Sequence, residues 1–304
     1  MDYKKYSNLI DLFFDQCDKQ PKDKIFLSDL GNIKKNFTWS DVKSSILQLA
    51  NEISKIIKYG DRCLLISENR PEWMISDISI MLAGGITVPA YTTYLSRDYE
   101  YIINDCTPSI VIVSNDTQFN KIKSICERNL SIKKIFSFEK LGDIENNGYF
   151  NIESLINNKI KTDKNEFEIK AKRSDPACII YTSGTQGNPK GVILSHGGIL
   201  SNCEGGHELL KPILDKETRF LTWLPLSHSY EHAVQFIQIA VGAKVFYAES
   251  IDKLIKNMSD CSPHIMTAVP RFYQNLYQKI NSTFKKAKGL KSVLVKNTVT
   301  LGTK

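Results

Sequence analysis

Residues 181–191 carry the residue types of a phosphate-binding loop. Their sequence, YTSGTQGNPKG, lies between two apolar runs. Gly184 and Gly187 permit positive φ angles and close approach of the main chain, so that backbone N–H groups can converge on a polyanion. Three hydroxyl groups and one cation supplement these donors: Thr182, Ser183, Thr185 and Lys190. A lysine supplies a point charge for phosphate oxygens.

The residues around Lys190 distinguish this loop from the P-loop of nucleoside triphosphatases. A P-loop ends in Gly-Lys-Ser/Thr and opens a helix, whereas here Pro189 precedes Lys190 and the β-prone residues 192–194 follow. We therefore expect a hairpin of strands 177–181 and 191–194, whose loop closes over a nucleotide as a flap. A plain hairpin turn would not require a serine, two threonines and a lysine together.

A second group of polar residues, His228, Glu231 and His232, matches the H-x-x-E-H pattern of inverted zinc peptidases. In that class, two histidines one helical turn apart bind zinc and the glutamate acts as general base. Zinc also needs a third protein ligand, and the only later glutamate, Glu249, lies in a strand-like run. Pro225 further places His228 at a helix start, where an i, i+4 pair is held least rigidly. The zinc peptidase stays an alternative that the spacing disfavours.

Alternating helical and strand patterns surround these candidate sites. Apolar residues at helical spacing predict helices at 9–17 and 42–57, the second capped by Ser40 or Asp41. Short apolar runs then alternate with helical segments. The expected strands are 62–67, 86–91, 110–114 and 134–138, and the expected helices between them are 73–84, 97–104 and 119–129. This order predicts an α/β fold with a parallel, helix-covered sheet.

The alternation is interrupted once and then resumes. Residues 139–176 are polar, with a short helix-like piece at 152–156, and we expect a variable surface connection there. A helix should begin at Ser195 or His196, after the loop. The further expected strands are 220–225, 242–249 and 264–269, with helices at 229–241 and 251–258. The basic residues 285–304 are expected to be solvated.

Composition narrows the class of protein. A chain of 304 residues with 42% hydrophobic residues is long enough for one large or two medium globular domains. The formal charge of +7 comes from lysines spread along the whole chain, so it does not indicate nucleic-acid binding.

The cysteines and the chain ends indicate the compartment. The seven cysteines are scattered and form no C-x-x-C pair, which is typical of reduced thiols in the cytoplasm. The first residues do not have the pattern of a signal peptide, and no apolar run is long enough to cross a bilayer. We expect a cytoplasmic protein, and any membrane association is expected to be peripheral.

Several segments together resemble one known family. Residues 181–191 are similar to the signature of the acyl-adenylate-forming (AMP-binding) superfamily. SENRPEW at 67–73, VPAYTTY at 88–94, LPLSH at 224–228 and TAVPRFYQNLY at 267–277 resemble its long-chain acyl-CoA synthetase branch. The resemblance covers almost all of the chain from about Phe37 onward. It departs from the family at Gln186, which stands where the family mostly has threonine or serine, so that an amide donor replaces a hydroxyl.

The resemblance implies a fold and a reaction. The fold would be the family's large N-terminal domain, incomplete, with interleaved α/β subdomains across residues 1–304. The reaction would be long-chain fatty acid–CoA ligation: the fatty acid reacts with ATP to give acyl-AMP, and coenzyme A then forms the thioester. Mg²⁺ would assist the phosphate chemistry. The partners implied are therefore the small molecules fatty acid, ATP and coenzyme A.

The resemblance also implies roles for particular residues. His228 would lie beside the acyl carboxylate and the nucleotide, while His232 is left as packing or surface. The segment with Val269, Pro270 and Arg271 would help to wall the acyl tunnel. The nucleotide phosphates would be bound by the loop: Thr182, Ser183, Gly184, Thr185, Gln186, Gly187 and Lys190.

Other elements of the family do not occur in these 304 residues. They are the adenine-side Y-G-x-T-E segment, the ribose-binding T-G-D aspartate, the hinge, and the C-terminal lid domain with its catalytic lysine. We therefore expect the chain to be the front part of a longer enzyme and to be inactive alone. A non-catalytic remnant that binds a nucleotide or an acyl group stays open as an alternative.

Overall fold

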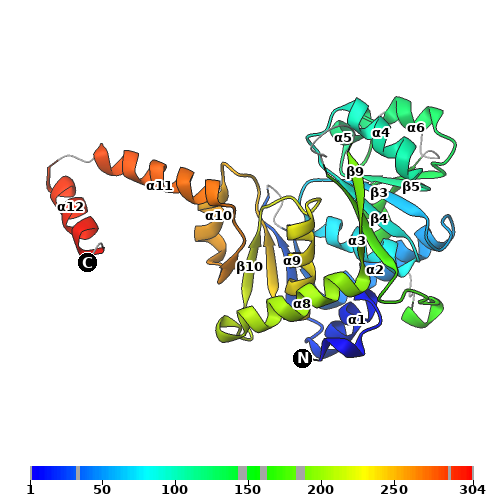
Figure 1. Ribbon diagram of the computed structural model, residues 1–304, viewed down its shortest axis with the longest axis horizontal. Helices are drawn as coiled ribbons and strands as arrows, with labels where there is room; N and C mark the ends of the chain where they lie inside the picture. The colour runs from blue at the N-terminus through cyan, green and yellow to red at the C-terminus, as the bar shows by residue number, and fades with distance from the viewer. Residues whose placement is uncertain are drawn as a thin grey trace. The chain divides into compact units, whose positions relative to one another are not determined.

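A computed structural model of the chain describes residues 2–31, 35–142, 149–157, 163–182, 189–286 and 289–302. The chain divides into two compact units, Met1–Met266 and Thr267–Lys304. The first unit contains two sheets and the helices that pack on them (Figure 1). This is the mixed α/β fold that the alternating pattern predicts.

The larger sheet has the order β7-β6-β5-β3-β4-β8-β9 among the described residues. Its strands are β3 (Arg62–Ile66), β4 (Ile86–Ala90), β5 (Ile110–Val113), β6 (Lys134–Ser137), β7 (Tyr149–Asn151), β8 (Pro176–Thr182) and β9 (Lys190–Ser195). All neighbours are parallel except β8 and β9, which are antiparallel. Because β4 and β5 lie on opposite sides of β3, the strand order reverses there. Ligands of open α/β sheets bind at such a reversal, beyond the carboxyl ends of the strands.

The central strands are apolar throughout because both of their faces are buried. In β3, Cys63 and Leu65 belong to one apolar core, while Leu64 and Ile66 belong to another. Helices α4 (Ser96–Cys106), α5 (Asp116–Asn120) and α6 (Lys123–Arg128) add apolar residues to the second core, which also contains residues of the strands. The period of two residues along a strand thus divides one continuous apolar run between two helical layers.

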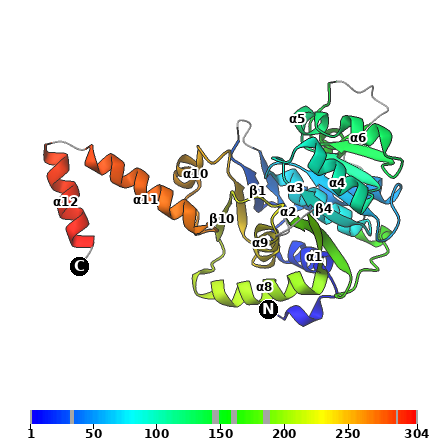
Figure 2. The same ribbon diagram turned by 45° about the horizontal axis from the view of Figure 1, so that its top comes forward.

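The smaller sheet has the order β12-β10-β11-β1-β2 in the described part of the chain. Its strands are β1 (Ile25–Asp29), β2 (Asn36–Thr38), β10 (Arg219–Thr222), β11 (Lys244–Tyr247) and β12 (Ile265–Met266). Five helices supply most of the helical residues of one apolar core, to which strands of both sheets also contribute. Figure 2 shows how the helices and sheets of this unit are arranged. The five helices are α1 (Leu9–Lys19), α2 (Trp39–Ser54), α3 (Pro71–Leu82), α8 (His196–Leu210) and α9 (Ser229–Ala240). This shared core joins the two sheets into one unit.

Some element boundaries differ from those expected. Helix α2 is capped by Thr38, not by Ser40 or Asp41, because the Thr38 hydroxyl accepts the Asp41 N–H and the Asp41 carboxylate accepts the Thr38 N–H. The single helix expected at 119–129 is two short helices, because the chain leaves helical geometry at Ile122, where φ is −121° and ψ is −7°.

The polar connection at 139–176 contributes more to the fold than its composition indicates. Strand β7 extends the larger sheet beyond β6, and helix α7 (Ile152–Asn157) follows it. Tyr149 and Ile152 are buried there. Strand β12, in contrast, spans only two residues of the six expected at 264–269.

The second unit consists of helical segments. Helix α11 (Pro270–Lys285) begins with a proline, which suits a first helical position because that residue's N–H has no intrahelical partner. Helix α12 (Leu290–Gly302) occupies the basic stretch that we expected to be merely solvated. Among the helices of the described residues, none is long and apolar enough to cross a membrane.

The contact between Phe26 and Trp39 gives a test of the core. Their rings stack with centroids 3.7 Å apart and planes 5° from parallel, and Trp39 is 1% exposed. We expect Trp39→Ala to lower the free energy of unfolding by about 3–5 kcal/mol, because the cavity cannot fill. Leu130→Ala, at a side chain that is 99% exposed, should change it by less than about 0.5 kcal/mol. Urea titrations that give equal values for the two variants would contradict this account of the core.

Candidate active site

Strands β8 and β9 form the antiparallel hairpin that the sequence predicts. Thr182 pairs with Lys190, and Tyr181 pairs with Gly191. The ends of the two strands therefore place a hydroxyl and an ammonium group on opposite sides of the connecting loop. The predicted loop donors lie outside the described residues: Ser183, Gly184, Thr185, Gln186 and Gly187.

The two strands of this hairpin pack closely against each other near the loop. A Cβ atom on Gly191 would lie 2.9 Å from Ile179 Cγ2 and 3.3 Å from Tyr181 Cζ, so glycine permits this cross-strand contact. The Tyr181 hydroxyl donates a hydrogen bond to the Asp105 carboxylate. Burial and this carboxylate raise the pKa of Tyr181 above its ordinary range, so its proton stays on the hydroxyl.

Lys190 is exposed at the start of β9, an edge strand of the larger sheet. Within the described residues its ammonium group has no hydrogen-bond or ion-pair partner. A lysine that is not neutralised by a carboxylate can meet an anion without first breaking an ion pair. Lys190 lies near the end of the predicted phosphate loop in the chain, and its role in phosphate binding stays a prediction.

His228 is the N-cap residue of α9 and is exposed. Its Nδ1 accepts a hydrogen bond from the Tyr230 N–H at 3.2 Å. The neutral ring therefore carries its proton on Nε2, which is left as the donor. Capping the helix thus also sets which ring nitrogen is offered to a ligand.

A groove of about 660 Å³ lies between β9, α8 and α9. Its volume is in the range of small-molecule sites. The residues that line it are mainly apolar: Ile193, Leu194, Ser195, Gly198, Ile199, Asn202, Ser229, Tyr230, Ala233, Val234 and Ile237. The groove thus adjoins both the strand that begins at Lys190 and the helix that His228 caps.

The loop after β3 is bonded to the segment that precedes α9. The Asn69 Nδ2 donates to the Leu224 carbonyl at 2.6 Å, and the Leu226 N–H donates to Asn69 Oδ1 at 3.0 Å. Pro225, between them, has no N–H to contribute. Two segments that resemble the same family separately, 67–73 and 224–228, are therefore in direct contact.

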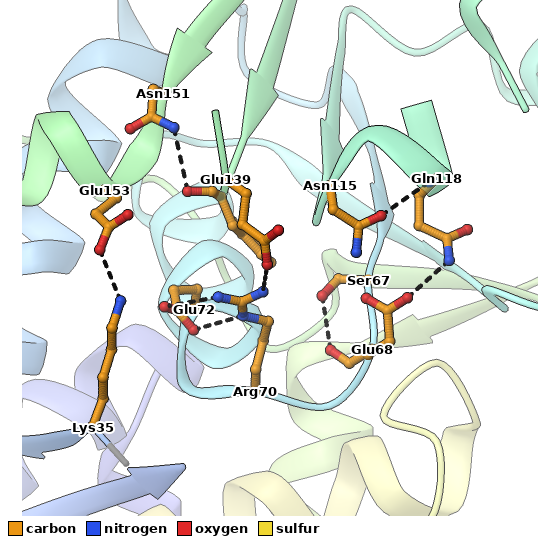
Figure 3. A network of polar contacts seen from close by, with 11 residues as sticks. Lys35, Ser67, Glu68, Arg70, Glu72, Asn115, Gln118, Glu139, Asn151 and Glu153 are labelled. Carbon is orange, nitrogen blue, oxygen red and sulfur yellow. Dashed lines mark hydrogen bonds and ion pairs between the residues drawn. The ribbon is translucent and has the colours of Figure 1, made fainter. Parts of the chain in front are cut away.

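Ion pairs and hydrogen bonds hold this loop against its neighbours (Figure 3). The Arg70 guanidinium donates to both Glu72 oxygens, at 2.9 and 3.3 Å, and to Glu139 at 2.8 Å. Gln118 Nε2 donates to Glu68 at 2.8 Å. The loop after β3 is thereby tied to the segments after β5 and β6, at the reversal of strand order.

His232 faces the interior, so it is a packing residue and not a surface one. It is fully buried, and its Nε2 lies 2.9 Å from Asp77 Oδ2 on α3. Gln235 Nε2 donates to the same carboxylate oxygen at 2.9 Å. Burial alone lowers the pKa of His232, but the Asp77 carboxylate outweighs it and Cys178 adds to the effect, raising the pKa to about 10. The Asp77 carboxylate beside it therefore favours the protonated form of His232.

This geometry opposes the zinc peptidase alternative. His228 is exposed, whereas His232 is buried and its Nε2 is engaged by Asp77. Across the part of the chain that the structure describes, no group of three or more histidine, cysteine, aspartate or glutamate side chains is placed to hold a metal. The described geometry therefore gives the H-x-x-E-H spacing no support as a zinc site.

The predicted acyl-wall residues Val269, Pro270 and Arg271 belong to the second unit. Pro270 is the first residue of α11, and the Phe272 N–H bonds to the Val269 carbonyl at 2.9 Å. Their role stays a prediction. The sequence did not predict the contacts of Asn69 and Asp77. The one available signal was Asp77, a charged residue within an otherwise apolar helical segment.

The fold and the hairpin define an α/β domain whose larger sheet is open and mainly parallel. The family model for AMP-binding enzyme matches residues 13–303. The chain therefore belongs to the AMP-binding enzyme family.

Curated relatives carry acyl-CoA synthetase names. The chain is 29% identical to Long chain acyl-CoA synthetase 3 of Arabidopsis thaliana over 79% of its own length and 38% of the relative. It is 26% identical to Long-chain-fatty-acid--CoA ligase FadD15 of Mycobacterium tuberculosis, over 79% of this chain and 40% of the relative. The chain thus spans less than half the length of these relatives.

Solved structures share the fold. The N-terminal domain of FACL13 from Mycobacterium tuberculosis is similar with a TM-score of 0.73 and 17% identity, over 90% of this chain and 65% of that one. ATP-bound MatB from Rhodopseudomonas palustris is similar with a TM-score of 0.72 and 21% identity, over 89% of this chain and 51% of that one.

The environments of two histidines predict opposite pH behaviour. The pKa of His232 is raised to about 10, so its pairing stabilises the fold below about pH 6.5 and is lost as the pH rises toward 10. Burial lowers the pKa of His196 to about 4, so its contribution is present above about pH 6.5 and is lost as the pH falls toward 4. In NMR spectra of histidine-labelled protein, we expect His232 to be charged at pH 8 and His196 to be neutral at pH 5. Titration of His232 near pH 6.5 would contradict the ion pair.

Proposed function

We propose that this chain is the nucleotide- and acyl-binding part of an AMP-forming long-chain fatty acid–CoA ligase. The observation that supports it most is the apolar groove between β9 and α9. One of its walls continues from the predicted phosphate loop, and another begins beside His228. A carboxylate at the end of an apolar chain would have its tail in the groove and its head beside phosphate donors.

The chemistry requires an activated carboxylate. A carboxylate oxygen attacks the α-phosphorus of ATP, the bond to the bridging oxygen breaks, and acyl-AMP and pyrophosphate form. The coenzyme A thiol then gives up its proton and attacks the acyl carbon, and AMP leaves. Both steps depend on positioning and on neutralising negative charge. Lys190 and the N–H and hydroxyl donors of the loop would neutralise the negative charge of the phosphates.

Mg²⁺ would be held largely by the substrate phosphates. At such sites the metal keeps few protein ligands and takes oxygen donors. The exposed Thr182 hydroxyl, opposite Lys190, is a donor of that chemistry in the hairpin. The metal would neutralise charge on the phosphate oxygens.

His228 would position the reacting groups. Its Nδ1 is held by the Tyr230 N–H, so Nε2–H is the donor that it offers. A donor beside a carboxylate and a phosphate can bridge the two and hold the nucleophilic oxygen near phosphorus. No general base is needed for this attack because a carboxylate is already ionised at neutral pH.

The acyl substrate would be long and apolar. The groove is lined mainly by aliphatic side chains, and the relatives bear the names of long-chain ligases. Residues 1–304 alone would not complete the reaction, because the ribose-binding and lid elements of the family do not occur in them. We therefore place the assays in the longest protein that contains this sequence.

Lys190→Ala tests the phosphate-binding assignment. We expect acid-dependent ATP–pyrophosphate exchange to fall by about 100-fold or more, because a charge aimed at the transition state is removed. Thermal unfolding should change little, since Lys190 is exposed. Lys55→Ala, an exposed lysine paired with Glu52, is the matched control and should retain exchange. Unchanged exchange in Lys190→Ala would exclude this role for the hairpin.

Substitutions of His228 test the donor role. Gln can present one N–H and Ala cannot, so we expect His228→Gln to retain more activity than His228→Ala. The loss in His228→Ala should be about ten- to a few-hundred-fold in kcat/KM, the value of one charge-assisted hydrogen bond. His264→Ala, at another exposed histidine, should stay near wild type. Equal losses in the Gln and Ala variants would remove the donor role.

A further inference from the structure

We propose that Asn69 and Asp77 are positioning residues that hold the segment 224–235 at two points on either side of His228. Asn69 bonds to residues 224 and 226, and Asp77 bonds to residues 232 and 235. The inference rests on the proposed function, because it assigns these residues to the placement of the same groove and the same imidazole. Neither side chain needs to touch a substrate.

The first point fixes the main chain before His228. Both polar ends of the Asn69 amide are used, one as a donor to Leu224 and one as an acceptor from Leu226. Leu226 is buried, so its N–H would otherwise lack water as a partner. Two bonds from one planar amide fix both the distance and the orientation of this segment. The His228 N–H then closes a turn onto the Pro225 carbonyl at 2.9 Å.

The second point fixes the first turns of α9. The Asp77 carboxylate receives hydrogen bonds from His232 and Gln235, which lie three residues apart and hence on one face of the helix. All three side chains are fully buried. Within the helix, the His232 N–H bonds to the His228 carbonyl at 2.9 Å. The Asp77 carboxylate therefore contacts α9 one helical turn after His228, the N-cap residue of the helix that lines the groove.

One face of helix α9 lines the groove, and the opposite face carries the polar residues that bond to the interior. Tyr230, Ala233, Val234 and Ile237 line the groove, whereas His232, Gln235 and Gln238 are buried on the side toward the interior. Apolar packing is non-directional and tolerates small slips of a helix, but hydrogen bonds weaken steeply with distance and angle. A polar inner face thus specifies the register of α9 more sharply than an apolar one would.

The anchoring residues are themselves held in place. Asn69 lies in the loop that Arg70 ties to Glu72 and Glu139 (Figure 3). Asp77 lies on α3, in which every residue is buried. The positions of Asn69 and Asp77 are therefore set by the larger sheet, whereas the segment that they hold leads from β10 of the smaller sheet into α9. Hydrogen bonds from residues positioned by the larger sheet therefore hold a segment that leads out of the smaller one.

Misplacement of a reacting group by about 1 Å can cost about 100-fold in rate. Removal of either anchor should therefore affect turnover more than it affects nucleotide affinity. The test compares Asn69→Ala and Asp77→Leu with Ser79→Ala. Ser79 is a matched control because it is buried on the same helix and its hydroxyl donates to Ile75 and to Ile46 of α2, not to the segment 224–235.

The first readout is amide hydrogen exchange of the purified chain. We expect peptides within 224–240 to exchange about tenfold faster or more in Asn69→Ala and Asp77→Leu, and to stay unchanged in Ser79→Ala. Asp77→Asn keeps an acceptor oxygen of the same shape and should give intermediate protection. If Asp77→Leu does not fold, the Asn variant and Asn69→Ala still decide the matter. Equal exchange in Ser79→Ala and the anchor variants would overturn the proposal.

The second readout is ATP–pyrophosphate exchange in the longest protein that contains this sequence. We expect Asn69→Ala to lower kcat by about 10- to 100-fold with a smaller change in the KM for ATP, and Ser79→Ala to keep kcat. A wild-type rate in Asn69→Ala would overturn the positioning role. If the wild-type protein itself shows no acid-dependent exchange, the proposed function fails, whereas the hydrogen-exchange comparison still decides whether the two anchors hold α9.

Discussion

Complete burial of helix α3 is the constraint on which the rest of the structure depends. Each of its twelve residues is buried, so it has no face on which a charge could reach water. A charge in such a helix is stable only when it is paired and hydrogen-bonded. Asp77 meets this requirement through His232 and Gln235 of α9. Burial of the Asp77 carboxylate therefore favours the packing of α9 against α3.

That second helix connects the packing to the chemistry. The inner face of α9 is hydrogen-bonded to α3, and its outer face lines the apolar groove. His228 caps its N-terminus. The hairpin of β8 and β9 reaches the same groove from the larger sheet. The proposed site, in which the hairpin loop binds phosphate beside an apolar groove, would thus be assembled from elements of two sheets, and the helices that pack on these sheets share one core.

Much of the fold could be predicted because its signals are local. The apolar runs of β3 and β5, the spacing in α1 and the Gly-Thr-Ser-Lys composition of the hairpin each report on nearby residues only. The errors occurred where local patterns conflict with tertiary packing. Strand β7 lies in a polar stretch that composition marks as a loop, yet it gains its hydrogen bonds from β6. Ser40 and Asp41 are also residue types that cap helices, but Thr38 is the cap because its hydroxyl accepts the Asp41 N–H.

The sequence by itself determined the α/β class and the hairpin with Thr182 and Lys190, since residue type and spacing carry that information. The role that it predicts for His228 stays a prediction. Only the tertiary structure decided the contacts of Asn69, Asp77 and His232. In each of the four hydrogen bonds made by Asn69 and Asp77, the partner lies 155 to 158 residues away in the chain. Side chains so distant are brought together by the burial of α3 between two sheets, and no local pattern encodes which buried polar groups will meet. The physical reason is that a buried charge takes its partner from whatever the fold packs against it.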